Sequence, residues 1–223
     1  MIIAIDGPAG SGKSTVSKLV AGKLDFLYVD TGAMYRAVTL KAMEEGADLN
    51  DEKTLADIAS RAKIELELDD RHALRVILDG KDVTRAIRTP ELTKNIKYVA
   101  GVPGVRKEMV KIQREVARKA LNGAVLEGRD IGTVVFPDAE YKFYLDAGAE
   151  ERIRRRHKEL IESGQDLKLS DVEKDVAQRD ESDMKRKIAP LKKAQDATLI
   201  DTTHMTIDEV VRSIIEKIKK SRR

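Results

Sequence analysis

The chain has 223 residues, enough for one compact unit with a core and an inserted lobe, and its 42 basic residues nearly balance 39 acidic ones. That balance is not typical of a nucleic-acid-binding protein, and the absence of cysteine excludes disulfides, thiolate zinc sites and a cysteine nucleophile. The first apolar run, residues 2–5, is too short for a signal peptide, and no run approaches the ~18 apolar residues of a membrane span. We therefore expect a cytoplasmic monomer without nucleic-acid or membrane partners.

The first part of the chain is predicted to alternate between strands and helices. Residues 1–6 are an apolar run typical of a short buried strand. After a glycine-rich turn, apolar residues recur at helical spacing from Val16 to Leu24. A second strand is predicted at residues 26–30 and a helix at 33–46, where a glycine ends it. The glycine-rich turn thus joins a strand to a helix.

The pattern then changes to that of a small antiparallel sheet. Residues 64–68 alternate apolar and polar side chains, and residues 74–84 carry the hairpin signal Asp79-Gly80 between apolar residues. This segment interrupts a chain that otherwise alternates strand and helix. We therefore interpret about 47–95 as an inserted lobe.

The second half returns to alternating elements. The predicted elements, in order, are a long amphipathic helix after Pro103, strands at 124–130 and 141–146, charged helices at about 149–163 and 170–187, a strand at 197–201 and a closing helix at 206–220. Strands that alternate with helices predict an α/β fold with a parallel sheet of about five strands, covered by helices on both faces. The expected core comprises 1–46, 96–148 and 185–223, with the charged pair at about 149–184 as a short helical lid.

The turn after the first strand carries the clearest chemical signal. Its sequence, DGPAGSGKST, matches the phosphate-loop pattern G-x-x-x-x-G-K-[ST], in which backbone N–H groups and a helix N-terminus surround a phosphate. Lys13 is expected to reach the β- and γ-phosphates of ATP, and the predicted Mg²⁺ ligands are Ser14 and Asp30. The predicted ATP-binding residues of this loop are Gly7, Pro8, Ala9, Gly10, Ser11, Gly12, Lys13, Ser14 and Thr15.

Three classes of protein share this loop. A GTPase switch would need the patterns DxxG and NKxD, and neither occurs in the chain. A motor or helicase ATPase usually has four apolar residues followed by Asp-Glu, and the nearest segment, AVLEGRD, has the wrong order. A small-molecule kinase needs a second, arginine-rich anion site and a cover that excludes water. The chain has candidates for both, which favours a kinase.

The candidate arginines lie near predicted strand ends and in the lid. Arg129 and Asp130 end one strand, and Arg36 follows the strand that ends at Asp30. Carboxyl ends of parallel strands meet at one crevice, and arginine binds phosphate with two parallel hydrogen bonds. In the lid, Arg152, Arg155 and Arg156 are either a solvated helix face or residues that close over ATP.

Several segments together resemble the bacterial cytidylate kinases, among the nucleoside monophosphate kinases. They are IDGPAGSGKST, DTGAMYRAV, EGRDIGTVVFPDA, RDESDMKRKIAPL and LIDTT, in family order from residue 3 to about 203. The resemblance implies a kinase of pyrimidine nucleotide metabolism, with an enlarged monophosphate-binding insert. It implies phosphoryl transfer from ATP-Mg²⁺ to CMP or dCMP. The alternatives are a kinase for another acceptor such as UMP, and a non-catalytic nucleotide-binding module.

The resemblance also implies roles for individual residues. Thr31 lies near the acceptor nucleotide, Arg36, Arg129 and Arg186 bind the CMP phosphate, Arg106 and Asp130 read the cytosine edge, and Arg179 and Asp183 lie near the ribose. The implied catalytic residues are Lys13, Arg129 and Arg186. The chain departs from the family at Lys97, where a small hydroxyl residue is expected.

The spacing of Arg179, Asp183 and Arg186 predicts that the three share one face of a helix. Two interpretations are open for this face. In one, Arg179 and Asp183 form a surface ion pair worth a few tenths of a kcal/mol. In the other, the face points into the CMP site.

Overall fold

The computed structural model describes residues 1–68, 74–162, 164–165 and 167–220. The chain divides into two units, one formed by Met1–Tyr28 with Ala120–Arg223 and the other by Val29–Lys119. The predicted insert at about 47–95 lies inside the second unit, and its role in monophosphate binding stays a prediction. Among the described residues, no helix is long and apolar enough to cross a bilayer.

The main sheet is built around the first strand of the chain. Its strands are β1 (Ile2–Asp6), β2 (Leu27–Asp30), β6 (Ala124–Gly128), β7 (Tyr141–Asp146) and β8 (Thr198–Asp201), in the order β2-β6-β1-β7-β8. β1 pairs in parallel with β6 on one side and with β7 on the other, so that Ile3 faces both Val125 and Tyr141. The predicted α/β fold with a five-stranded sheet is confirmed. Its strand ends meet beside the glycine-rich turn, as expected for parallel strands.

The apolar runs form strands because the centre of the sheet is buried on both faces. Ile3, Ile5, Val125, Leu126 and Leu145 have no exposed surface, as in parallel strands covered on both sides. The helices α1 (Lys13–Leu24) and α8 (Ile207–Lys220) pack against each other, and α1 packs against β6. This packing fixes the helix that begins at the phosphate loop.

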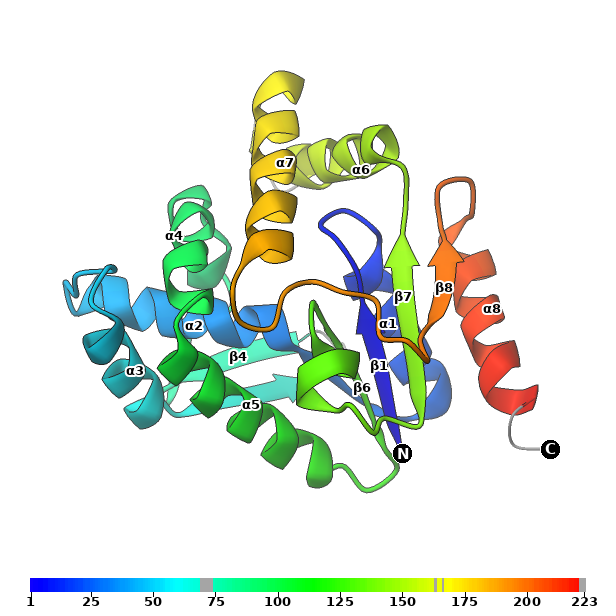
Figure 1. Ribbon diagram of the computed structural model, residues 1–223, viewed down its shortest axis with the longest axis horizontal. Helices are drawn as coiled ribbons and strands as arrows, with labels where there is room; N and C mark the ends of the chain where they lie inside the picture. The colour runs from blue at the N-terminus through cyan, green and yellow to red at the C-terminus, as the bar shows by residue number, and fades with distance from the viewer. Residues whose placement is uncertain (69–73, 163, 166, 221–223) are drawn as a thin grey trace. The chain divides into compact units, whose positions relative to one another are not determined.

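The two charged helices of the predicted lid are α6 (Ala149–Glu162) and α7 (Leu169–Lys185), with bounds close to those expected. Figure 1 shows α6 following β7 at the upper end of the strands. Despite the weak apolar periodicity of both helices, Leu160, Val172 and Val176 form a small buried cluster between them. The lid therefore has a core of its own.

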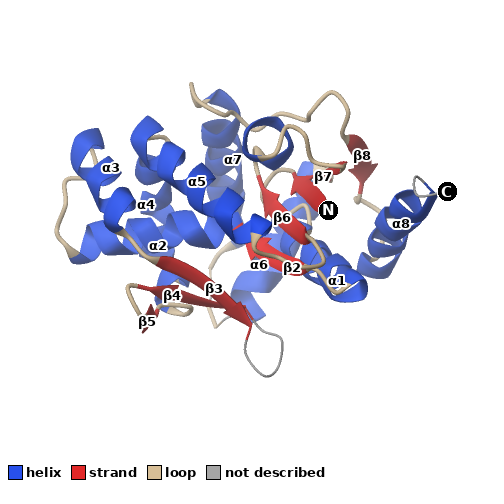
Figure 2. Ribbon diagram, turned by 90° about the horizontal axis from the view of Figure 1, so that it is seen from below, coloured by secondary structure: helices blue, strands red, loops and turns tan. Residues whose placement is uncertain are grey.

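The second unit combines helices with an antiparallel sheet (Figure 2). Its elements are α2 (Thr31–Glu44), α3 (Glu52–Arg61), β3 (Ile64–Leu68), β4 (Leu74–Leu78), β5 (Lys81–Asp82), the 3₁₀ helix η1 (Ala86–Arg88), α4 (Pro90–Ala100) and α5 (Pro103–Arg118). The strands lie in the order β3-β4-β5, and the predicted hairpin turn is confirmed at Asp79 and Gly80, with φ of 50° and 82°. Two positive φ angles identify a type I′ turn, which suits a tight hairpin. α3 and α4 have no counterpart among the sequence-based predictions.

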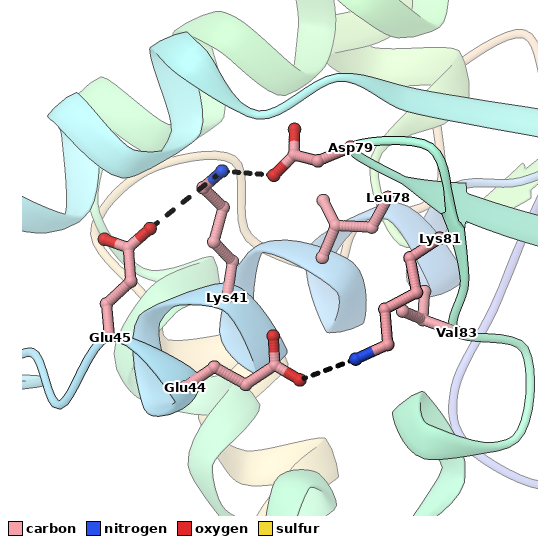
Figure 3. Close-up of a pocket in the computed structure, with 7 residues that line it drawn as sticks. All are labelled: Lys41, Glu44, Glu45, Leu78, Asp79, Lys81 and Val83. Carbon is pink, nitrogen blue, oxygen red and sulfur yellow. Dashed lines mark hydrogen bonds and ion pairs between the residues drawn. The ribbon is translucent and has the colours of Figure 1, made fainter.

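A small pocket lies between α2 and the β4–β5 hairpin (Figure 3). Its volume of ≈ 200 Å³ is below the roughly 300–1,000 Å³ of most small-molecule sites. Lys41 pairs in it with Glu45 and Asp79, and Lys81 lies 4.0 Å from Glu44. Opposite charges already satisfy each other there, and none of the predicted site residues lines the pocket.

Candidate active site

The phosphate loop has a shape that requires glycine at two positions. Gly10 and Gly12 have φ of 74° and 87°, in the left-handed region that favours glycine. A Cβ atom on Gly10 would also lie 2.6 Å from the carbonyl oxygen of Arg152, in the first turn of α6. The loop is therefore shaped both by its own backbone and by the lid helix packed on it.

Lys13 begins α1 and points back into this loop. Its Nζ donates to the carbonyl oxygen of Pro8 at 2.6 Å and to Ser11 Oγ at 3.4 Å. Burial, followed by the nearby charge of Arg129, lowers the pKa of Lys13 to about 7. A buried ammonium beside a second cation is a strong attractor for anionic phosphate.

Glu127 is a site residue that the sequence reasoning missed. It lies buried on β6 and accepts hydrogen bonds from Ser14 Oγ at 2.9 Å and from the hydroxyl of Tyr28. The segment AVLEGRD does not fit the acidic strand of a motor ATPase. Yet a glutamate followed by glycine at the end of an apolar run indicates a carboxylate at the carboxyl end of a strand, where parallel sheets bind their ligands.

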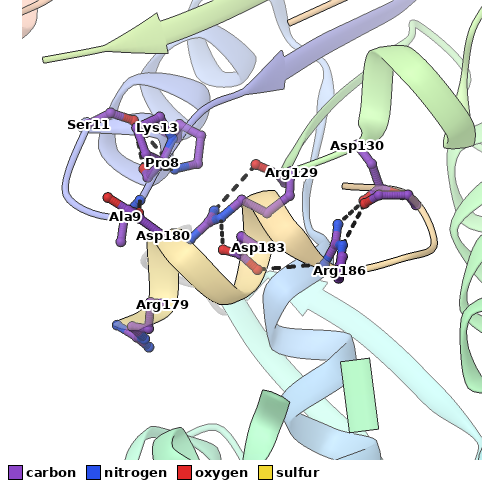
Figure 4. Close-up of polar contacts among 12 residues, drawn as sticks. Pro8, Ala9, Ser11, Lys13, Arg129, Asp130, Arg179, Asp180, Asp183 and Arg186 are labelled. Carbon is purple, nitrogen blue, oxygen red and sulfur yellow. Dashed lines mark hydrogen bonds and ion pairs between the residues drawn. The ribbon is translucent and has the colours of Figure 1, made fainter. Parts of the chain in front are cut away.

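Four predicted residues form a network of charges between the end of β6 and the end of α7 (Figure 4). Arg129 Nε donates to Asp183 Oδ2 at 2.7 Å, and Arg186 lies 3.6 Å from Asp183 and 3.5 Å from Asp130. Burial lowers the pKa of Arg129, but the charge and hydrogen bond of Asp183 outweigh burial and raise it. Arg129 and Arg186 are 57 positions apart in the sequence. The fold thus brings together residues that are distant along the chain.

The helix-face prediction for Arg179, Asp183 and Arg186 is wrong in one respect. α7 ends at Lys185, and Arg186 has extended backbone angles, φ −60° and ψ 140°. Arg179 pairs with Asp175 at 3.5 Å, and Figure 4 shows its side chain pointing away from Asp183. The proposed surface pair of Arg179 with Asp183 is replaced by the Arg129–Asp183 pair, because Arg129 reaches the carboxylate from the strand end.

The three lid arginines predicted to bind ATP have different surroundings. Arg152 donates to the carbonyl oxygen of Ala9 at 3.1 Å. Arg155 donates to Thr202 Oγ1 at 2.9 Å. Arg156 pairs with Glu159 through Nη1, but its buried Nε has no hydrogen-bond partner within the described part of the chain.

The remaining predicted residues belong to the second unit. Asp30 caps α2, where its Oδ1 accepts from the N–H of Ala33, and Thr31 is the buried first residue of that helix. Arg36 donates to Thr93 Oγ1 at 2.8 Å. Arg106 is buried on α5, donates to the carbonyl oxygen of Ala100 at 3.0 Å and lies 5.3 Å from the ring centre of Tyr35. Lys97 lies on α4, with its Nζ 5.0 Å from the ring centre of Tyr98.

Asp6 anchors the segment that follows Arg129 and Asp130. Its carboxylate, at the end of β1, accepts from the backbone N–H groups of Ile131 and Gly132, both at 2.8 Å. These residues open a short π-helical turn, Ile131–Val135. Burial raises the pKa of Asp6 to about 6, although the two amide hydrogen bonds oppose that effect.

This raised pKa predicts a specific pH dependence of stability. The folded protein binds the Asp6 proton more tightly than the unfolded chain, so lowering the pH from 7 to 5 stabilises the fold at this residue. We expect the free energy of unfolding of the wild type to rise by about 1 kcal/mol relative to Asp6→Asn over that interval. Urea unfolding of both proteins at the two pH values measures it. Parallel pH dependence of the two would contradict the assignment.

The chain is similar to known proteins in sequence and in fold. The family model for cytidylate kinase matches residues 3–220 of the chain. The cytidylate kinase of Desulforamulus reducens is 54% identical over 220 residues, 99% of this chain and 97% of that protein. That of Shouchella clausii is 50% identical over 221 residues, again 99% and 97%. An uncharacterised protein from Eubacterium ventriosum, with a solved structure, matches 98% of both chains at a TM-score of 0.52 and 12% identity, a likeness of fold alone.

Proposed function

This chain belongs to the cytidylate kinase family, and from that premise we infer that it transfers a phosphoryl group from ATP to CMP or dCMP, giving ADP and CDP or dCDP. The observation that carries the conclusion is 54% identity to a cytidylate kinase over 99% of the chain. The alternatives, a kinase for another acceptor and a non-catalytic nucleotide-binding module, are not favoured.

The charges around the phosphate loop suit such a transfer. Catalysis of phosphoryl transfer depends mainly on positioning and on fixed positive charge near the transferred group. Lys13 is buried and Arg129 is partly buried, and the two lie close enough for the charge of Arg129 to lower the pKa of Lys13. We propose that Lys13, Arg129 and Arg186 are the catalytic cations. An anionic phosphate between them would relieve their mutual repulsion.

No general base is needed in this proposal. The attacking group is an oxygen of the CMP phosphate, which is already anionic at neutral pH, so orientation is sufficient. The Asp130 carboxylate instead serves to orient Arg186, its partner at 3.5 Å. Asp183 holds Arg129 in the same way, at 2.7 Å.

We propose that Mg²⁺ is held at Ser14. The Ser14 hydroxyl and the Glu127 carboxylate are oxygen donors 2.9 Å apart, and Mg²⁺ prefers oxygen ligands from one or two side chains together with substrate phosphates. When bound, the ion would neutralise phosphate charge. Glu127 joins Ser14 in this proposal, beside the originally predicted Asp30.

For the acceptor, we propose that Thr31, Arg36 and Arg106 of the second unit contribute to the CMP site. Their residue types, carried over from the family resemblance, support this role. Of the lid arginines Arg152, Arg155 and Arg156, we propose that Arg156 faces the ATP phosphates, and that Arg179 lies near the ribose, as the resemblance implies. We also propose a cytoplasmic monomer, on the sequence grounds given above.

A coupled assay of ADP release tests the function. With ATP and Mg²⁺ alone, ADP should form slowly, and CMP or dCMP should raise the rate strongly. UMP, AMP and GMP serve as competing acceptors. A rate that is the same with and without any acceptor would identify an ATPase and overturn the proposal.

Two substitutions at the end of α7 separate ribose from phosphate contacts. Asp183→Ala is expected to weaken binding of CMP more than of dCMP, because dCMP lacks one hydroxyl for the carboxylate to bind. The loss of such a charged hydrogen bond corresponds to about 1.5–3 kcal/mol. Arg186→Ala should weaken both acceptors equally and leave ATP binding nearly unchanged. Steady-state kinetics with each acceptor measure these effects.

A weaker binding of CMP in Asp183→Ala could have a second cause. Asp183 also pairs with Arg129, so its removal could act through that arginine instead of through the ribose. In that case CMP and dCMP would be affected equally, which would contradict the ribose contact. A thermal melt of each variant shows whether the fold is intact.

A further inference from the structure

The backbone of Ala9, in the phosphate loop, is held on both sides by the lid. Its N–H donates to Asp180 Oδ1 on α7 at 3.2 Å. Its carbonyl oxygen accepts from Arg152 Nη1 on α6 at 3.1 Å. Arg152 and Asp180 are themselves an ion pair, so the three groups form a closed ring of polar contacts. The backbone of one loop residue thus receives contacts from both lid helices.

Burial distinguishes this ion pair from the others of the lid. The side chains of Arg152 and Asp180 are each 11% exposed. Among the described residues of α6, the other ion pairs join neighbouring turns of that helix, for example Arg154 with Glu151. Surface pairs of that kind contribute little to stability. Removing one partner of a buried, hydrogen-bonded pair is strongly destabilising, because it leaves an uncompensated buried charge.

Arg152 also fixes the start of α6. Its Nε donates to the carbonyl oxygen of Ala147 at 3.0 Å, just before the helix begins. Its backbone carbonyl oxygen lies 2.6 Å from the place that a Cβ atom of Gly10 would take, so α6 rests directly on the loop. The same two helices carry Arg156 and Arg179. Docking of Arg152 and Asp180 on Ala9 therefore sets the distance of those arginines from the phosphate loop.

We propose that Asp180 is a positioning residue that, together with Arg152, latches α6 and α7 onto the backbone of Ala9 and so closes the lid over the ATP phosphates. The Asp180 carboxylate touches the loop backbone and Arg152, not the substrates. Closed lids exclude water and align the transferred group. The latch therefore favours transfer to the nucleotide over transfer to water. This inference rests on the proposed function.

The test is Asp180→Asn, with Glu181→Gln as the matched control. Asparagine keeps an acceptor for the Ala9 N–H but removes the charge that holds Arg152. Glu181 is the next residue of α7, pairs on the surface with Lys185 and does not contact the loop, so the control loses an equal charge elsewhere. We expect kcat to fall on the order of tenfold in Asp180→Asn, as for one lost charge-assisted hydrogen bond. The control should match the wild type.

The decisive measurement is the ratio of ATP hydrolysis without acceptor to phosphoryl transfer with CMP. A variant that is only partly folded loses both activities equally, so its ratio stays that of the wild type. An unlatched lid admits water, and we expect the ratio to rise on the order of tenfold in Asp180→Asn. Arg152→Gln should raise it similarly, and the double variant should be no worse than either single one, because the two residues act as a unit.

The outcomes separate the latch from the proposed function. If the wild type does not phosphorylate CMP, the proposed function fails. If the wild type phosphorylates CMP, and Asp180→Asn has the same ratio of ATP hydrolysis to phosphoryl transfer as Glu181→Gln, the proposed latch is wrong. Additive losses in the double variant would also overturn it. Should Asp180→Asn not fold, Arg152→Gln alone decides, since it leaves the Asp180 contact with the Ala9 N–H in place.

Discussion

Replacement of Lys13 by alanine is expected to lower the rate of phosphoryl transfer at least ~100-fold, equivalent to about 3 kcal/mol of activation free energy. The ammonium is buried at the phosphate loop and is held there by Pro8 and Ser11. Charge that develops on the transferred group would lose its nearest fixed cation. ATP binding should weaken less than the rate, because the loop amides remain. Single-turnover kinetics with saturating ATP and CMP separate the two effects.

Lys18→Ala is the matched control for this prediction. Lys18 is an exposed lysine on the same helix, α1, so its removal changes the net charge equally without reaching the loop. Thermal melts should show both variants folded. Near-normal turnover of Lys13→Ala would overturn the catalytic role of the lysine.

Arg129→Ala is expected to lower the transfer rate even more, on the order of a thousandfold, as when a charge-stabilising arginine is removed from a phosphoryl-transfer site. The loss has two sources. The phosphate loses a partly buried cation beside Lys13, and the partly buried Asp183 carboxylate loses the donor that lies 2.7 Å away. Arg129→Lys keeps the charge but not the planar pair of donors, so it should recover only part of the rate.

Arg154→Ala serves as the control, since Arg154 is an exposed lid arginine whose charge is paired with Glu151. It should retain wild-type kinetics. If Arg129→Ala and Arg154→Ala behaved alike, or if Arg129→Lys were fully active, the specific role of the Arg129 guanidinium would be contradicted.

Most of the first unit could be predicted because its pattern is local. β1, β7 and both lid helices were recognisable as apolar runs or charged amphipathic stretches bounded by turn residues. α3 and α4 were missed, although each carries a start signal. Asp51 caps α3 by accepting from the N–H groups of Lys53 and Thr54, and Thr89 caps α4 ahead of Pro90. The alternating, strand-like pattern of the segment between the two helices favours a strand prediction for the whole insert, so the capping residues alone do not identify α3 and α4.

The sequence predicts which residues belong to the candidate site, but not which of them form ion pairs or hydrogen bonds with each other. The phosphate-loop pattern identifies Lys13 and Ser14, because each residue type at that spacing has one chemical task. The partner of Asp183 could not be read from sequence: a neighbour on the helix, Arg179, was the natural candidate, and the fold supplies Arg129 instead. Glu127 is an intermediate case: its position at the end of an apolar run is visible in the sequence, but its hydrogen bond with Ser14 depends on the pairing of β1 with β6.

The central position of β1 has a consequence for the order of folding. β1 is synthesised before Val29–Lys119, and both of its sheet neighbours, at residues 124–128 and 141–144, are synthesised after that whole segment. Its apolar edges must therefore wait unpaired while a contiguous segment with its own helices and hairpin emerges and can fold first. Closing such long loops is entropically costly and slows folding. The strand that precedes the phosphate loop is thus made well before the two strands that pair with it.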